Sequence, residues 1–417
     1  NWDENFHLHP DERFLTMVGT AMKLPTSINQ YFDQKTSLMN PANIGFNFFV
    51  YGRFPLILTK YLAVVYNFDN YNDFTILGRQ LSAFFDLLII FLIIKTVELL
   101  EKKNKLSPSL KYWAGFFYAI AVLPIQLSHF FAVDTFLNFF MFGSFYFALR
   151  YSMKGEKTSP LRDIFLSSVF FGLALSCKIT ALFILPLNLL FLIKTIFSQR
   201  QSLIKTAGFV FVYFMFGYFT LRLADPYYFQ NKNLFDPTIS ATFIENIKSL
   251  KNMTIKSMDN WFPPMVQWLN KNTVIHGLEN NIIFGLGIPY AILVITGMIK
   301  VVLSFPYIRQ AQHKLRRESI PILIILFWTL GFFGYQSIQV TPTLRYFIII
   351  YPFLSIFAAI GIEYLINYKF KLKDKDILYP KKYSYIFIFI SVCILLLWPI
   401  MFSSIYLNKN SRVTASE

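Results

Sequence analysis

The chain has 417 residues, of which 55% are hydrophobic and 15% are charged, and its mean hydropathy is +0.46. Apolar runs long enough to cross a bilayer recur along it, which excludes an ordinary soluble protein and predicts an all-α, polytopic bundle of transmembrane helices. The net charge of +16 does not indicate nucleic-acid binding, because the Lys and Arg residues gather in short segments between apolar runs instead of forming a basic stripe on a soluble face.

Residues 1–76 are the first predicted region, a slightly acidic loop on the outer side of the membrane. Within it, residues 12–24 have apolar side chains at helical spacing, which predicts a helix lying along the membrane surface. Residues 46–66 are apolar enough to span, but Arg53 and a following proline interrupt them. We therefore expect a re-entrant or interfacial helix there.

Ten membrane spans are predicted next, six in residues 77–222 and four in residues 282–417, with a long outer loop or cap at residues 223–281 between them. The predicted spans are 77–100, 112–128, 132–150, 161–176, 179–197, 204–222, 282–303, 320–338, 345–366 and 384–405. Just over half of the 39 Lys and Arg residues lie in alternate connecting segments, which the positive-inside rule assigns to the cytoplasm. Asn1 and Glu417 then both lie outside. Because no initiator methionine or signal peptide is visible, we expect a fragment with a first span before Asn1.

Six ionisable residues stand out because each falls at the outer end of a predicted span. They are Arg79, His129, Asp134, Lys178, Arg222 and Arg345. A charged group at membrane depth costs about 2.5–3.5 kcal/mol on insertion scales, so such groups usually line a cavity or pair with one another. The pattern predicts a hydrated, charged pocket that opens outward beneath the first loop. The alternative for Arg79 and Arg222 is that they extend to the membrane surface while their stems stay buried.

The stretch from Phe6 to Phe14 concentrates polar chemistry at the start of the chain. His7, His9, Asp11 and Glu12 could together bind a divalent metal, since imidazole and carboxylate are common metal ligands. The alternative for the two acids is a helix start, where carboxylates are favoured by the helix dipole. Neither a phosphate-binding glycine loop nor a dinucleotide-binding or zinc-protease motif occurs, so no ATP-driven or nucleotide-sugar chemistry is predicted.

Six short motifs follow one another along the chain. They are Asp11-Glu12, Tyr51-Gly52-Arg53-Phe54-Pro55-Leu56, Gly78-Arg79-Gln80-Leu81-Ser82, His129 with Asp134-Thr135, Ser176-Cys177-Lys178-Ile179-Thr180-Ala181, and Arg345-Tyr346 with Tyr351-Pro352. Taken together, they resemble the membrane-embedded glycosyltransferases of the C-type fold, in the branch of the protein O-mannosyltransferases and lipid A aminoarabinose transferases. The similarity covers roughly residues 1–200 and 340–360.

This resemblance implies transfer of a sugar, with inversion, from a polyprenyl-phosphate donor to an acceptor hydroxyl at the outer face. It implies Asp11 as the catalytic carboxylate and Glu12 as its acidic partner. The implied phosphate-binding residues are Lys178, Arg345, Tyr346 and Arg79, and the implied supporting residues are Asp134, His129, Tyr51 and Arg53. The chain departs from the family at Cys177, where relatives usually carry threonine before the lysine.

The sequence therefore predicts a multi-pass plasma-membrane glycosyltransferase with its active site on the outer side. The implied partners are a polyprenyl-phosphate-linked sugar, membrane lipid, and an acceptor glycan, lipid or protein. No cofactor is required for such a reaction, although a divalent metal could take part. Two alternatives are a transporter or flippase of a lipid-linked or anionic solute, which would need acids deep in the membrane such as Asp86 or Glu363, and a non-catalytic membrane scaffold.

Overall fold

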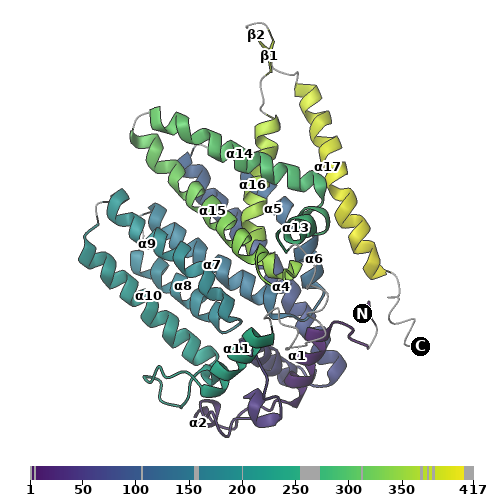
Figure 1. Cartoon of the computed structure of the whole chain (residues 1–417), viewed down its shortest axis with the longest axis vertical. Helices are drawn as coiled ribbons and strands as arrows, with labels where there is room; N and C mark the ends of the chain where they lie inside the picture. The colour runs from purple at the N-terminus through teal and green to yellow at the C-terminus, as the bar shows by residue number, and fades with distance from the viewer. Residues whose placement is uncertain are drawn as a thin grey trace.

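The apolar runs fold as long helices that pack into one bundle in a computed structural model of the protein (Figure 1), and the predicted all-α fold class is confirmed. The structure describes residues 2–3, 6–104, 107–154, 159–199, 201–253, 273–310, 313–366, 370–372, 375–377 and 381–407. The middle of the predicted outer loop, residues 254–272, and the predicted outer tail from residue 408 onward lie outside these ranges.

The first loop contains four short helices before the first long one. They are α1 (Pro10–Ala21), α2 (Ile28–Tyr31), the 3-10 helix η1 (Pro41–Ile44) and α3 (Phe54–Val65). Helix α1 begins at a proline, which suits the first turn, and the side chain of His9 caps it by accepting from the backbone N–H of Glu12. Leu15 and Val18 on its inner face are buried, so a helix is present where the spacing predicts one, and its place along the membrane surface remains a prediction.

Each predicted span coincides with a helix or a pair of helices. The first group comprises α4 (Tyr71–Asn104), α5 (Leu110–Ala119), α6 (Val122–Ser128), α7 (Val133–Lys154), α8 (Pro160–Leu175), η3 (Ile179–Ile184), α9 (Leu185–Gln199) and α10 (Leu203–Ala224). The second comprises α14 (Ile288–Gln310), α15 (His313–Ser337), η6 (Leu344–Ile350), α16 (Tyr351–Ile366), α17 (Lys381–Ser403) and η7 (Ser404–Leu407).

Between the two groups lie η4 (Pro226–Tyr228), α11 (Ala241–Met253), α13 (Thr273–Glu279) and the π-helix η5 (Asn280–Leu286). The two short strands β1 (Phe370–Leu372) and β2 (Lys375–Ile377) pair antiparallel. Among the described residues, five helices are long and apolar enough to cross a membrane, or up to seven if each of two bent pairs counts as one span. The protein is thus a multi-pass membrane protein, and the number of ten spans remains a prediction.

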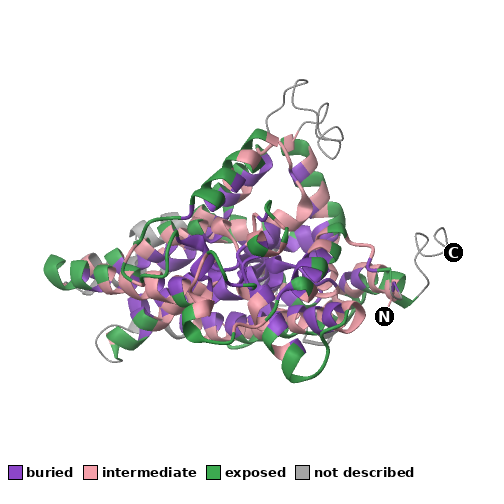
Figure 2. Cartoon of the chain, turned by 90° about the horizontal axis from the view of Figure 1, so that it is seen from below, coloured by how far each residue is buried: buried purple, intermediate pink, exposed green. Residues whose placement is uncertain are grey.

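Helices α14 and α16 form the tightest crossing at the centre of the bundle. A Cβ atom at Gly297 would collide with the carbonyl oxygen of Phe357, and one at Gly361 would collide with that of Leu293. Glycine at both positions therefore lets the two backbones touch, as small residues do in membrane helix pairs. Helix α16 is accordingly almost wholly buried. Buried residues gather in the middle of the molecule, and exposed ones lie on the helices around its edge (Figure 2).

The bundle has two distinct ends. Helices α1, α2 and α11 lie together at one end, and β1, β2 and the adjacent ends of α14 and α15 lie at the other (Figure 1). The first loop therefore covers one end of the helices, where the breaks between α6 and α7 and between α8 and η3 also lie. The candidate site is built at this end.

Candidate active site

Asp11 lies in the first turn of α1 and faces Arg345, the second residue of η6. The Nη1 atom of the arginine contacts Oδ2 of Asp11. Both side chains remain partly exposed, with 20% of the Arg345 side chain and 28% of the Asp11 side chain accessible to solvent. The Nε atom of Arg345 is buried and has no hydrogen-bond partner among the described residues. This guanidinium therefore has an unused donor beside an accessible carboxylate.

Tyr346 connects this pair to a second, deeper ion pair. The Nζ atom of Lys178 lies 2.9 Å from Oδ1 of Asp134 and 4.6 Å from the centre of the Tyr346 ring. The guanidinium of Arg345 lies 5.1 Å from the same ring. Two cations thus flank one aromatic ring, and each of them is paired with one carboxylate.

Lys178 occupies the break between α8 and η3, where its backbone is extended. Burial of the amino group disfavours its charged form, but the neighbouring Asp134 carboxylate and Tyr346 raise the pKa of Lys178 above its usual value. The side chain is only 13% exposed and stays protonated at neutral pH. It offers a fixed positive charge at the floor of the site.

The segment from Tyr51 to Phe54 is fastened directly onto this break. The N–H of Gly52 donates to the carbonyl of Cys177 at 2.8 Å, and the N–H of Phe54 donates to that of Ser176 at 3.1 Å. A Cβ atom on Gly52 would collide with the Ser176 carbonyl, so only glycine permits this approach. The docking explains why α3 begins only at Phe54, although the apolar run begins earlier, and it brings the Tyr51 ring within 5.9 Å of the Lys178 Nζ atom.

Glu12, in contrast to Asp11, points into the protein and is fully buried. Its two oxygens accept from Nε and Nη2 of Arg79 at 2.8 and 2.7 Å, and Oε1 also accepts from the N–H of Phe131 at 2.7 Å. Asp3, which the sequence analysis did not single out, is also buried and bonds both terminal nitrogens of Arg79 at 3.0 and 2.9 Å. Arg79 thus binds two carboxylates of the first loop.

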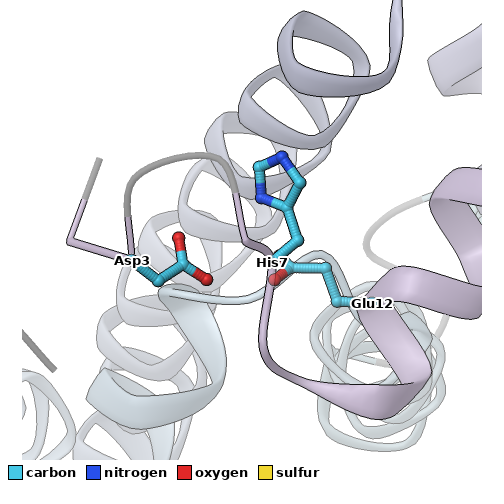
Figure 3. A group of neighbouring side chains, drawn as sticks. All are labelled: Asp3, His7 and Glu12. Carbon is cyan, nitrogen blue, oxygen red and sulfur yellow. The ribbon is translucent and has the colours of Figure 1, made fainter. Parts of the chain in front are cut away.

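Asp3, His7 and Glu12 also form a group whose ligand atoms all lie within 4.8 Å of one another (Figure 3). This group differs from the predicted metal ligands, since Asp3 takes part and His9 and Asp11 do not. His7 has a left-handed backbone (φ 45°), its Nε2 atom lies 2.9 Å from Oδ1 of Asn72, and its buried Nδ1 atom has no partner among the described residues.

A metal does not fit this group as it stands. Both carboxylates are already ion-paired with Arg79, whose guanidinium occupies their oxygens and whose positive charge would repel a second cation from them. An ion could bind only if the guanidinium moved away.

Replacing Arg79 with methionine is expected to destabilise the protein by about 3–5 kcal/mol, because two buried carboxylates lose their charged partner. Thermal unfolding of the purified protein measures the effect, and Arg13→Met, at an exposed position of α1, is the matched control. Adding Zn²⁺ or Mg²⁺ should leave the unfolding temperature of the unaltered protein unchanged. A clear increase would mean that the ion displaces Arg79.

Asp11, Asp134, Lys178, Arg345 and Tyr346 thus form one convergent group. The remaining residues predicted for the pocket lie outside this group. The ring of His129 stacks on Tyr406 of η7 at 3.8 Å, and its Nδ1 atom lies 2.7 Å from the carbonyl of Ile125. Arg222 donates to backbone carbonyls of the loop that follows α10, among them those of Asn231 and Asn233, so it orders that loop. Asp86 lies deeper and accepts from the hydroxyl of Tyr118 at 2.6 Å.

Comparison with known proteins gives one family and one fold. Residues 28–230 match the family described as dolichyl-phosphate-mannose-protein mannosyltransferase. No curated protein sequence matches the chain. A structure of the Archaeoglobus fulgidus oligosaccharyltransferase with Zn and sulfate matches with a TM-score of 0.60 and 13% identity, over 96% of this chain and 49% of that one.

A second structure, the oligosaccharyltransferase AglB of the same organism with an inhibitory peptide and a dolichol-phosphate, gives a TM-score of 0.56 and 11% identity, over 96% of this chain and 52% of that one. The structure of ArnT from Cupriavidus metallidurans in the apo state gives a TM-score of 0.47 and 14% identity, over 91% of this chain and 61% of that one. The chain thus spans about half the length of the oligosaccharyltransferases that it matches. The resemblance predicted from the motifs is confirmed: the chain shares the fold of these oligosaccharyltransferases, and its residues 28–230 match the dolichyl-phosphate-mannose-protein mannosyltransferase family.

Proposed function

We propose that the protein is a membrane glycosyltransferase that moves a sugar, with inversion, from a polyprenyl-phosphate donor to an acceptor hydroxyl on the outer face of the plasma membrane. The observation that carries this proposal is the convergence of Asp11, Asp134, Lys178, Arg345 and Tyr346, which come from four segments far apart in the sequence. The matches with the mannosyltransferase family and with a dolichol-phosphate-bound oligosaccharyltransferase support a lipid-linked donor.

Asp11 is the general base in this proposal. It is the one carboxylate of the convergent group that lies in the first loop, and at 28% exposure an acceptor hydroxyl can reach it. Removing the hydroxyl proton while the oxygen attacks the anomeric carbon is general-base catalysis, which typically contributes a factor of about 10²–10⁴. Attack from the side opposite to the departing phosphate inverts the configuration at that carbon.

Lys178 and Arg345 bind the donor phosphate in this proposal. The phosphate gains negative charge as the glycosidic bond breaks, and fixed cations in a site of low dielectric constant stabilise that charge most when it develops. The unpartnered Nε atom of Arg345 supplies a donor, and the Lys178 amino group supplies a second positive charge on the other side of Tyr346.

A phosphate at this place would compete with Asp11 for Arg345. While the guanidinium contacts the carboxylate, it favours the ionised form of Asp11 and makes it a weak base. Once the guanidinium turns to the phosphate, the affinity of Asp11 for a proton rises. Donor binding would thus prepare the base for the acceptor, and no metal or other cofactor is required.

The acceptor can be a glycan, a lipid or a protein, because the site residues recognise the donor phosphate and the acceptor hydroxyl alone. The outer-face assignment rests on the basic segments at the far end of the bundle. A transporter of a lipid-linked solute, the alternative function, would use Asp86 as a site deep in the membrane, but its carboxylate is hydrogen-bonded to Tyr118.

The test is a transfer assay on the purified protein in vesicles. Short-chain polyprenyl-phosphate mannose, and the same lipid carrying glucose or aminoarabinose, is supplied with an extract of envelope glycans and lipids, and release of polyprenyl phosphate is measured by mass spectrometry. We expect acceptor-dependent release with one of these donors. Absence of release, together with exchange of labelled lipid-linked sugar across the vesicle membrane, would instead establish the transporter.

A further inference from the structure

Asp225, the first residue after α10, is fully buried where three segments of the chain meet. Its Oδ2 atom accepts from the backbone N–H of Arg53 at 2.7 Å, and both of its oxygens lie 3.4 Å from Nη1 of the same arginine. The guanidinium lies 5.7 Å from the centre of the Phe49 ring and 5.6 Å from that of Tyr228. One carboxylate thus fixes both the backbone and the side chain of Arg53.

The segment that Asp225 holds is the one docked on the lysine-bearing break. The bonds from Gly52 and Phe54 to the carbonyls of Cys177 and Ser176 lie on either side of Arg53 in the chain. On the other side of Asp225, the hydroxyl of Tyr228 donates to the carbonyl of Leu175, the last residue of α8, at 3.0 Å. The break is therefore attached at three successive carbonyls, those of residues 175, 176 and 177, to elements that meet at Asp225.

These attachments act on the backbone immediately before Lys178, the residue that places a positive charge beside Tyr346. Burial disfavours the ionised form of Asp225 and raises its pKa above the usual value, although the neighbouring Arg53 acts in the opposite direction. The contribution of this pair is therefore to fix the position of Arg53, because a buried ion pair adds little net stability. If Arg53 lost its partner, a cation at 5% side-chain exposure would be left uncompensated. The cost of this buried charge would favour release of the segment from Tyr51 to Phe54 from the break.

We infer that Asp225, acting through Arg53, is a positioning residue that holds the Lys178 amino group where a polyprenyl phosphate binds. This inference rests on the proposed function for its ligand. It assigns no contact between Asp225 and the substrate. A purely structural role would predict that loss of Asp225 lowers stability and leaves the phosphate affinity of the folded protein unchanged.

A double-mutant cycle tests the inference, with farnesyl phosphate as the probe and the full chain in detergent or nanodiscs. Asp225→Asn keeps the size of the side chain and an acceptor oxygen but removes the charge. We expect it to weaken farnesyl phosphate binding about tenfold in the unaltered background and less than about twofold when Lys178 is already alanine, because residues that act as a unit are not additive. Arg53→Lys, which retains the charge, is expected to bind more tightly than Arg53→Ala.

Asp236→Asn is the matched control, since Asp236 lies in the same loop but bonds only exposed neighbours such as Thr238. It should leave binding unchanged. If Asp225→Asn does not fold, Tyr228→Phe removes only the hydrogen bond to Leu175 and should weaken binding in the same non-additive way. Equal weakening in the presence and absence of Lys178, or no weakening in folded Asp225→Asn, overturns the inference. Failure of the unaltered protein to bind farnesyl phosphate overturns the proposed function itself.

Discussion

Replacing Asp11 with asparagine is expected to lower the rate of sugar transfer by about a hundred- to ten-thousand-fold, which is the usual contribution of a general base. Asparagine has the same shape but cannot accept the acceptor's proton at neutral pH. Because the exchange also frees Arg345 from its carboxylate, binding of the polyprenyl phosphate should be as tight as before or tighter. The rate is measured as polyprenyl phosphate released under saturating donor, and the affinity by direct titration.

Asp33→Asn is the control for this experiment, since Asp33 is a partly exposed acid of the same loop whose carboxylate accepts from the N–H groups of Lys35 and Thr36. Asparagine caps such a turn equally well, so its transfer rate should not change. Near-normal transfer by Asp11→Asn would exclude Asp11 as the base. Equal loss in both variants would point to a disturbed first loop.

Replacing Arg345 with glutamine is expected to weaken the binding of farnesyl phosphate by about 10- to 150-fold, because a hydrogen bond to a charged group contributes about 1.5–3 kcal/mol. The same change leaves Asp11 without its cation, and therefore raises its pKa. The rising, base-dependent limb of the curve of kcat/KM against pH, which reports the free enzyme, should shift to higher pH in this variant. A titration and a pH profile in the same buffer series measure the two effects.

Arg13→Gln provides the comparison, since Arg13 is an exposed cation of α1 that lies two residues from Asp11. It tests whether any loss of positive charge in the first loop weakens the binding of farnesyl phosphate. An unchanged affinity in Arg345→Gln, or an equal decrease in Arg13→Gln, would show that Arg345 does not bind the phosphate.

The sequence was sufficient to predict the helical bundle because membrane helices are encoded locally. An apolar run of the length of a bilayer can satisfy its own backbone hydrogen bonds only as a helix, so each of the ten predicted ranges has a helix. The basic connecting segments predict which end of the bundle faces the cytoplasm. Because successive spans alternate in direction, the same reasoning predicted that Asp134, Lys178 and Arg345 lie at one end of the bundle.

Which of these charges would pair, and with what, did not follow from the sequence. Asp3 pairs with Arg79, 76 residues away, and Asp225 with Arg53, 172 residues away, and no local pattern specifies contacts of that range. Asp225 lies in the predicted outer loop 223–281, and the sequence analysis did not single it out.

The different roles of Asp11 and Glu12, which are adjacent in α1, could have been predicted from helix geometry. Side chains of neighbouring helical residues point about 100° apart, so Asp11 and Glu12 cannot both face the same surface. The structure directs Glu12 inward to Arg79 and Phe131 and leaves Asp11 partly exposed beside Arg345. Arg222, which the sequence analysis placed in the charged pocket, instead donates to backbone carbonyls of the loop that follows its own helix.

The contact between Arg345 and Asp11 also bears on how the protein would recover after each transfer. At that moment Asp11 carries the proton taken from the acceptor and cannot accept another. When the spent lipid departs, the guanidinium is free to return to the carboxyl group, and an adjacent positive charge favours release of that proton to water. One arginine would therefore regenerate the base for the next cycle as well as hold the leaving group.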